Sequence, residues 1–140
     1  MSFLGLDVGE KRIGVARSDE LNFMAHTVGF IERRTDKQAG EEISKLVDEF
    51  QAEKIVVGLP KTMKGEVGTQ AEKTFLFIEK LRKHVLCPIA TWDERLTTVE
   101  AEKALIAQDI SRAKRKKKRD AISAEIMLQS YLDFLKQKGS

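Results

Sequence analysis

Carboxylates occur at three positions of this sequence where local structure alone does not require an acid. The first is Asp7, inside the apolar segment that opens the chain. The second is the pair Asp93 and Glu94, where a later apolar segment ends. The third is Asp120, which directly follows a run of basic residues. Carboxylates gathered without histidine or cysteine make a site of hard oxygen ligands, which suits Mg²⁺ or Mn²⁺.

A site of this kind would act on phosphate esters. Mg²⁺ held by a few carboxylates commonly also binds substrate phosphate. A pair of ions about 4 Å apart would activate a water molecule and stabilise the leaving oxygen in phosphodiester hydrolysis. The two histidines, His26 and His84, are far apart and show no ligand spacing. The pattern therefore does not indicate a zinc site.

The positive charge of the chain is concentrated in one segment. The formal net charge is only +3, but residues 111–119, SRAKRKKKR, hold seven basic residues and no acidic one. Such a segment can bind the phosphates of nucleic acid. A solvated loop is the alternative, because blocks of like charge repel one another. The contacts predicted within this segment are Lys114, Arg115, Lys116 and Lys117.

The strand that carries Asp7 is predicted from the first residues of the chain. Residues 3–8 and 13–18 are two largely apolar segments separated by a turn, which predicts a β-hairpin. Side chains alternate along a strand, so Leu4 and Leu6 face one way and Asp7 the other. A lone carboxylate in a core strand is costly unless it is paired or binds a metal. We expect Asp7 to share its site with a cation, and a buried structural hydrogen bond is the alternative.

The remaining segments predict an α/β fold. Helix 37–51 is expected to have Asp36 as its N-cap and to turn Ile43 inward. Residues 54–59, KIVVGL, form a continuous apolar run, as in a buried strand of a parallel sheet. The other predicted elements are strands 26–32 and 88–93 and helices 69–84, 97–108 and 120–136. The order of segments predicts three antiparallel strands followed by two parallel ones, with helices on both faces of the sheet. This arrangement is a single three-layer domain over residues 1–140.

The predicted topology can bring the carboxylates together, because sites in open α/β sheets collect at the strand ends. Alternation alone does not decide whether Asp93 or Glu94 faces such a site. Both could also be a solvated strand end paired with Arg95, and Asp120 could be a simple N-cap. Gly58, Gly65 and Gly68, in and just before the loop at residues 60–68, could bring backbone N–H groups to a phosphate, although their spacing is not that of a Walker loop.

Composition limits the class of protein. A length of 140 residues with 41% hydrophobic residues fits one globular domain. We expect no targeting segment and no membrane span, since no apolar run approaches about 18 residues. The single cysteine, Cys87, excludes an internal disulfide and suggests a reducing, cytoplasmic location.

Four stretches together resemble one known family. In chain order they are GLDVGEKRIGVARSD, VVGLPKTMKGEVGTQA, WDERLTT and DAISAEIMLQSYLD. They are similar to the YqgF/RuvX family, which is related to Holliday-junction resolvases of the RuvC type, and the similarity covers nearly the whole chain. The resemblance implies a ribonuclease H-like fold with a five-stranded mixed sheet.

The resemblance also implies which residues form the site. The catalytic carboxylates would be Asp7, Glu94 and Asp120, with the pair Asp93 and Glu94 filling the acidic position before Arg95. The same four acidic residues would supply the ligands of a divalent metal ion, and Arg95 would contact phosphate. Glycines at positions 5 and 9 are expected to leave room for the ion and for backbone.

The activity implied by the resemblance is that of a nuclease. The roles proposed for the family are maturation of the 5′ end of pre-16S ribosomal RNA and resolution of Holliday junctions. The chain departs from the family pattern beside Asp120, where Arg119 stands in place of an apolar residue and Ser123 in place of an alanine. These departures leave the orientation of that carboxylate open.

Two other functions are compatible with these residues. A non-catalytic RNA-binding factor for ribosome assembly would use the same basic segment. In the nuclease as well, Lys11 and Arg12 in the first turn could contact nucleic acid, and a solvated turn is the alternative. The Asp-x-Gly hairpin also resembles a phosphate motif of the actin and sugar-kinase group, but those folds need two such domains. A resolvase would be expected to form a homodimer, because it cuts two strands symmetrically.

Overall fold

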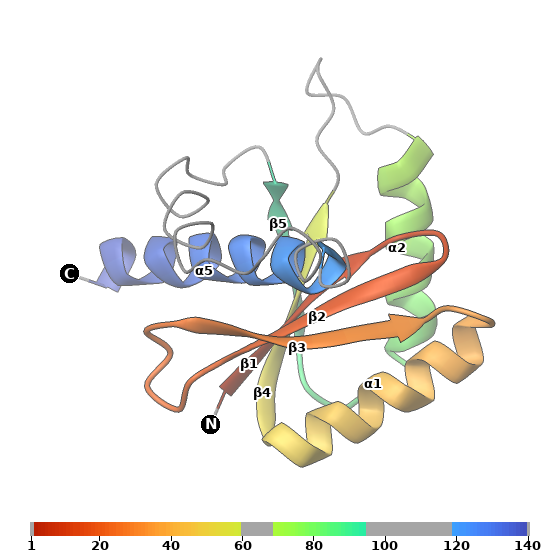
Figure 1. Ribbon diagram of the computed structural model, residues 1–140, viewed down its shortest axis with the longest axis horizontal. Coiled ribbons are helices and arrows are strands. Elements are labelled where there is room, and N and C mark those ends of the chain that lie inside the picture. The colour runs from red at the N-terminus through yellow and green to blue at the C-terminus, as the bar shows by residue number, and fades with distance from the viewer. Residues whose placement is uncertain (1, 60–68, 95–118, 140) are drawn as a thin grey trace.

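The computed structural model describes residues 2–59, 69–94 and 119–139. Five strands form one sheet in the order β3-β2-β1-β4-β5 (Figure 1). The strands are β1 (Ser2–Val8), β2 (Arg12–Ser18), β3 (Ala25–Glu32), β4 (Ala52–Leu59) and β5 (Ile89–Asp93), and the helices are α1 (Asp36–Phe50), α2 (Thr69–Leu81) and α5 (Arg119–Gly139). The expected loop at 60–68, the helix expected at 97–108 and the basic segment up to residue 118 lie outside the described residues, as do the side chains of residues 119 and 120.

The sheet is mixed, as the order of segments predicts. β1 pairs antiparallel with β2, and β2 antiparallel with β3. β4 lies parallel to β1 on one side and to β5 on the other. Residues 55–57 of β4 are completely buried. The continuous apolar run at 54–59 is therefore confirmed as a central strand covered on both faces.

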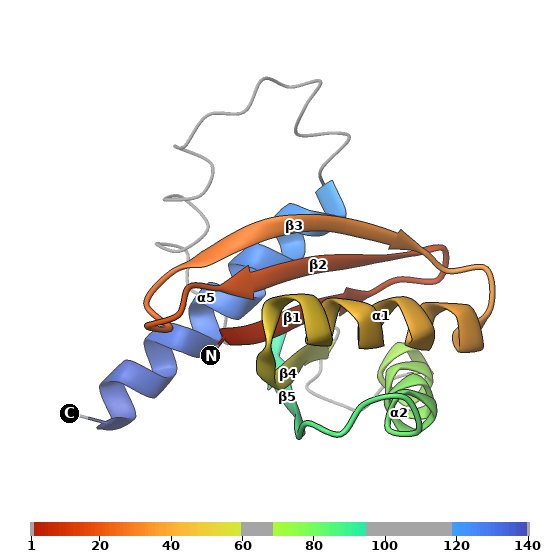
Figure 2. The same ribbon diagram turned by 90° about the horizontal axis from the view of Figure 1, so that it is seen from below.

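Helices cover the two faces of the sheet, which gives three layers (Figures 1 and 2). Leu4 and Leu6 lie in a core that includes residues of α1 and α2, such as Ile43 and Phe77. Phe3 lies in a second core with residues of α5. We call these sides of the sheet the α1/α2 face and the α5 face. The alternation predicted for the first strand is confirmed.

Helix α1 begins one residue earlier than the sequence analysis expects. Its N-cap is Thr35, which has extended backbone dihedral angles and accepts a hydrogen bond from the backbone N–H of Gln38. The Gln38 side chain accepts in return from the N–H of Thr35, which completes a capping box. The prediction that Asp36 is the N-cap is therefore wrong, and Asp36 is the first residue of the helix. Ile43 is buried as expected.

The other helices also differ in length from the prediction. α2 ends at Leu81 instead of continuing to His84, and residues 82–84 form a turn. α5 continues to Gly139, three residues beyond the predicted end. Among the described residues, no helix is long and apolar enough to cross a membrane.

Two glycines in the first hairpin make room for neighbouring parts of the chain. A Cβ atom at Gly5 would lie 3.0 Å from the Cβ of Leu128, so this glycine allows α5 to pack closely on β1. A Cβ atom at Gly9 would lie 2.7 Å from the carbonyl oxygen of Arg12, so this glycine allows the tight turn between β1 and β2. Gly9 thus leaves room for backbone, as expected, whereas Gly5 leaves room for the side chain of Leu128. Room for an ion beside these glycines stays a prediction.

Candidate active site

Asp7 lies on the α5 face of the sheet, near the end of β1. Phe3, four residues before Asp7, packs in the core beneath α5, and Val8, directly after Asp7, packs against the core on the opposite face. Because side chains alternate along a strand, Asp7 points to the same face as Phe3, which is the α5 face. The residue is half-buried. The carboxylate is thus at the end of a core strand, where a site in an open α/β sheet is expected.

Glycines flank Asp7 on both neighbouring strands. On β2, its register partner is Gly14. On β4, the register runs through the pair Leu6 and Val57, so the next step places Gly58 beside Asp7. The positions directly beside Asp7 on both neighbouring strands are therefore glycines, which have no side chain.

Glu94 lies over Gly58 on the same face. A Cβ atom at Gly58 would lie 2.8 Å from Oε1 of Glu94 and 3.0 Å from Cγ of Met127, a buried residue of α5. The Glu94 side chain therefore leans from the end of β5 across β4, in the direction of β1. Because Gly58 is also next to Asp7, the two carboxylates occupy adjacent positions on the α5 face.

Asp93 faces the other side of the sheet. Its neighbour Trp92 lies in the core beneath α5, so alternation along β5 turns Asp93 to the α1/α2 face. The structure thus separates two adjacent acids that the sequence alone could not distinguish. Glu94 shares a face with Asp7, and Asp93 does not.

Asp120 is the second residue of α5, and its side chain is not described. Residues four and seven positions later, Ala124 and Met127, pack against the sheet, so position 120 belongs to the same stripe of the helix. The C-terminal part of α5 lies at the β2–β3 turn, where Lys136 donates a hydrogen bond to the carbonyl of Phe23. The helix therefore begins toward the end of β1 that carries Asp7 (Figures 1 and 2).

The predicted nucleic-acid contacts are only partly described. Lys11 and Arg12 are exposed at the turn between β1 and β2. The guanidinium carbon of Arg12 lies 5.9 Å from the centroid of the Phe30 ring. Arg95 and the cations at 114–117 lie outside the described residues. Among the side chains that are described, no three histidine, cysteine or acidic residues form a group that could hold a metal ion.

Comparison with known proteins identifies the family of this chain. The model of the family described as "RuvX: Holliday junction resolvase" matches residues 1–134. The chain belongs to the RuvX family. The resemblance noted from four stretches of sequence is thereby confirmed.

Relatives of this RuvX-family chain match over almost their whole length. A protein of Desulforamulus reducens named "Putative pre-16S rRNA nuclease" is 49% identical over 133 residues, which are 95% of this chain and 97% of the relative. A protein of Halothermothrix orenii with the same name is 48% identical over 134 residues, 96% of each chain.

Solved structures with the same fold include two resolvases. RuvC of Thermus thermophilus in complex with a Holliday junction substrate matches with a TM-score of 0.61 at 11% identity, over 98% of this chain and 96% of RuvC. The fowlpox virus resolvase in complex with Holliday junction DNA matches with a TM-score of 0.56 at 14% identity, over 96% of this chain and 99% of the other. At these identities the likeness shows the fold alone, and it confirms the ribonuclease H-like α/β class.

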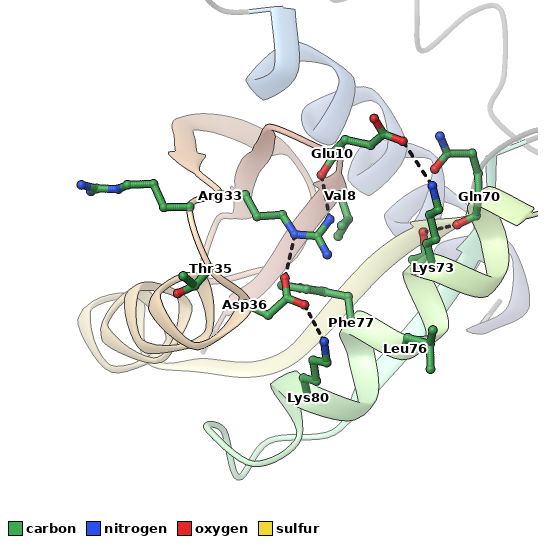
Figure 3. A pocket seen from close by; sticks show the side chains of 13 residues that line it. Val8, Glu10, Arg33, Thr35, Asp36, Gln70, Lys73, Leu76, Phe77 and Lys80 are labelled. Atoms are coloured by element: carbon green, nitrogen blue, oxygen red, sulfur yellow. Dashed lines mark hydrogen bonds and ion pairs between the residues drawn. The ribbon is translucent and has the colours of Figure 1, made fainter.

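The RuvX-family chain also has a pocket of about 410 Å³ at the same end of the sheet but on the α1/α2 face (Figure 3). Asp36 accepts hydrogen bonds from Nε of Arg33 and Nζ of Lys80, both at 2.9 Å, and Arg33 also donates to the carbonyl of Gly9. The pKa of Asp36 is lowered, mainly by the hydrogen bond from Arg33; partial burial opposes this effect, and Lys80 adds to it. These contacts tie the β1–β2 turn to α1 and α2, so this network supports the strand end that carries Asp7.

Gly58 is the site residue whose role the sequence analysis missed. The sequence suggests that this glycine could offer its backbone N–H to phosphate, whereas the structure shows that its missing side chain accommodates the carboxylate of Glu94. The spacing within KIVVGL contains no signal for this, because the contact depends on how the end of β5 lies against β4.

Substitution of Gly58 by alanine is expected to damage the site more than the fold. The added Cβ would force the end of the Glu94 side chain to move, and a misplacement of about 1 Å can reduce activity about 100-fold. The expected loss of unfolding free energy is about 1 kcal/mol, since Met127 must also shift. Cleavage rate and urea denaturation would measure the two effects.

The matched control is Gly5→Ala, which adds a Cβ on the same face of the adjacent strand. That atom would meet Leu128 and no carboxylate. Gly5→Ala should lower stability and leave the activity of the folded protein unchanged. Equal activity of the wild type and Gly58→Ala would show that the position of Glu94 does not matter.

Proposed function

We propose that this protein is a metal-dependent endonuclease that hydrolyses phosphodiester bonds in structured nucleic acid, in the processing of the 5′ end of pre-16S rRNA. The observation that carries the proposal is the placement of Asp7 and Glu94 on one face of the sheet, over adjacent strands, with Gly58 between them. The names of the relatives that are 49% and 48% identical over nearly the full chain support the substrate.

The donor set suits Mg²⁺ or Mn²⁺. Asp7 and Glu94 offer hard carboxylate oxygens on one face, whereas Cys87 and His84 lie on the other, against the α1/α2 core and against Gly40 of α1. Asp7, Glu94 and Asp120 would hold the ion, with Asp120 supplied by the first turn of α5. The opposite orientation of Asp93 argues against including it as a ligand. When bound, the ion would activate a water molecule and stabilise the charge that develops on the leaving oxygen.

Other residues of this chain would bind and orient the substrate. Lys11 and Arg12, exposed at the β1–β2 turn, lie at the end of the sheet where Asp7 is found, and they would contact backbone phosphates. Arg95 and the basic segment containing Lys114, Arg115, Lys116 and Lys117 would extend this contact, since they flank Glu94 and Asp120 in the sequence. The proposal includes a cytoplasmic location, which the single cysteine favours.

Holliday junction resolution is the second candidate, because the family model carries that description. A resolvase cuts two strands related by a two-fold axis, so this function would require a homodimer. A processing ribonuclease can act as a monomer. A protein that binds pre-rRNA without cutting it is the third candidate, and only turnover distinguishes it from a nuclease.

An end-labelled cleavage assay tests the proposal. The substrates are a pre-16S 5′ leader, a four-way DNA junction and a single-stranded control, each incubated with Mg²⁺, Mn²⁺ or EDTA. We expect cleavage of the leader with either metal and none in EDTA, because the carboxylates alone cannot activate water for this attack. Metal-dependent cleavage of the junction alone would favour the resolvase. Salt-sensitive binding without cleavage of any substrate would favour the assembly factor.

A further inference from the structure

Phe30 is an exposed aromatic residue on the same face of the sheet as the two carboxylates. Its neighbour Ile31 is buried in the core on the α1/α2 face, so alternation along β3 turns Phe30 to the α5 face. The residue is nevertheless 46% exposed, so α5 leaves much of it uncovered. A single exposed ring needs no special explanation, and the position of this one is what suggests a function.

Asp7 and Phe30 lie in one row across three strands. Asp7 pairs with Gly14 of β2, and Gly14 pairs with Phe30 of β3. Two strand spacings, about 10 Å, separate the outer two backbones. The glycine between them adds no side chain to the row. A nucleotide whose phosphate lies at Asp7 could therefore place its base, or the base of the next nucleotide, over Phe30.

A cation lies beside this ring. Arg12 is the exposed first residue of β2, and its guanidinium carbon lies 5.9 Å from the ring centroid of Phe30. Proteins that bind single-stranded nucleic acid combine aromatic rings, which stack on bases, with cations that follow the backbone. Arginine can also strengthen the contact through its interaction with the ring. Phe30 and Arg12 provide one group of each kind.

The backbone of β3 is irregular immediately before Phe30. The pairing with β2 shifts register between Val15 and Ala16. Opposite this shift, Gly29 has a φ of +150°, which L side chains rarely adopt. Bulges of this kind commonly redirect a side chain beside an active site. The glycine thus sets the direction in which the following residue, Phe30, leaves the strand.

We infer that Phe30 stacks on an unpaired nucleobase next to the phosphate that is cut. The substrate class is accordingly nucleic acid that is single-stranded at the cleavage site, and this inference rests on the proposed nuclease function. A base inside a continuous duplex has both faces covered by its neighbours, so it offers no face to the ring. Phe30 would therefore distinguish unpaired from paired substrate.

Binding in EDTA tests the inference without requiring cleavage. The probes are a fluorescein-labelled RNA strand of about 12 nucleotides and the same strand in a duplex, measured by fluorescence anisotropy. Phe30→Ala should weaken binding of the single strand about tenfold, the loss expected for one stacked base, and leave duplex binding unchanged. The matched control is Phe75→Ala, since Phe75 of α2 is similarly exposed at 41% but lies in the opposite layer.

A second variant gives a direct signal of stacking. Trp92 is the only tryptophan of the chain and is buried, so Phe30→Trp adds one exposed fluorophore whose emission the single strand should quench. Unchanged emission, together with single-strand binding that Phe30→Ala does not weaken, would overturn the stacking role and leave the nuclease proposal intact. Failure of the wild type to bind either probe would overturn both.

Discussion

Asp7→Asn is expected to reduce cleavage about 1,000-fold, at the upper end of what one electrostatic group in an active site contributes. The substitution retains the size of the side chain and removes the charge that would bind the metal ion. The sheet should remain folded, because Asp7 lies half-buried at the end of β1 and the core residues on both faces are unchanged. Single-turnover cleavage of the pre-16S leader in Mg²⁺ measures the effect, with circular dichroism as the test of folding.

Binding separates a catalytic role of Asp7 from a structural one. The affinity of Asp7→Asn for the leader in EDTA should match that of the wild type, since the basic residues that would contact phosphate are unchanged. Asp48→Asn, a similar change within α1, is the control and should retain full activity. Full activity of Asp7→Asn would eliminate the proposed site, whereas a joint loss of binding and folded structure would assign Asp7 to the core.

The fold could be predicted because both faces of the sheet are buried. In β1, Leu4 and Leu6 face one side of the sheet and Asp7 faces the other. A slip of one residue would exchange these faces, so only one register fits the two cores. The apolar run of β4 predicts a central strand for the same reason. The sequence alone predicts the start of α1 one residue too late, because both Thr35 and Asp36 are good N-cap residues. The glutamine three residues after Thr35 was the available signal, since it completes a capping box.

The site could be predicted less completely than the fold, because it depends on contacts between distant segments. The sequence places Asp93 and Glu94 at a strand end, but only the neighbouring strand shows which one leans toward Asp7. The contact at Gly5 likewise has no sequence signal, since the position of Leu128 in a helix more than 120 residues away decides it. No distinctive sequence signal marks Phe30, because its position in one row with Asp7 depends on the register of three strands.

Glu94→Gln and Asp93→Asn should have opposite outcomes although the two residues are adjacent. Glu94→Gln removes a carboxylate from the face that carries Asp7, so we expect cleavage to fall about 100- to 1,000-fold. Asp93→Asn changes the other face and should leave cleavage within about twofold of the wild type, as for a surface substitution away from the site. Initial rates on the pre-16S leader at saturating Mg²⁺ measure both. The reverse result would mean that β5 is shifted by one residue, since such a slip exchanges the faces of a strand.

A double variant tests whether Gly58 acts through Glu94. If the glycine matters only because its missing side chain accommodates that carboxylate, then Gly58→Ala should cause no further loss of activity in a Glu94→Gln protein that has already lost the charge. The two losses would then be strongly non-additive, as expected for residues in direct contact. Additive losses would instead show that the alanine disturbs another part of the site, such as the packing of Met127, in the first half of α5, against the sheet. Non-additivity would establish that Gly58 acts by leaving room over β4 for the catalytic carboxylate of Glu94.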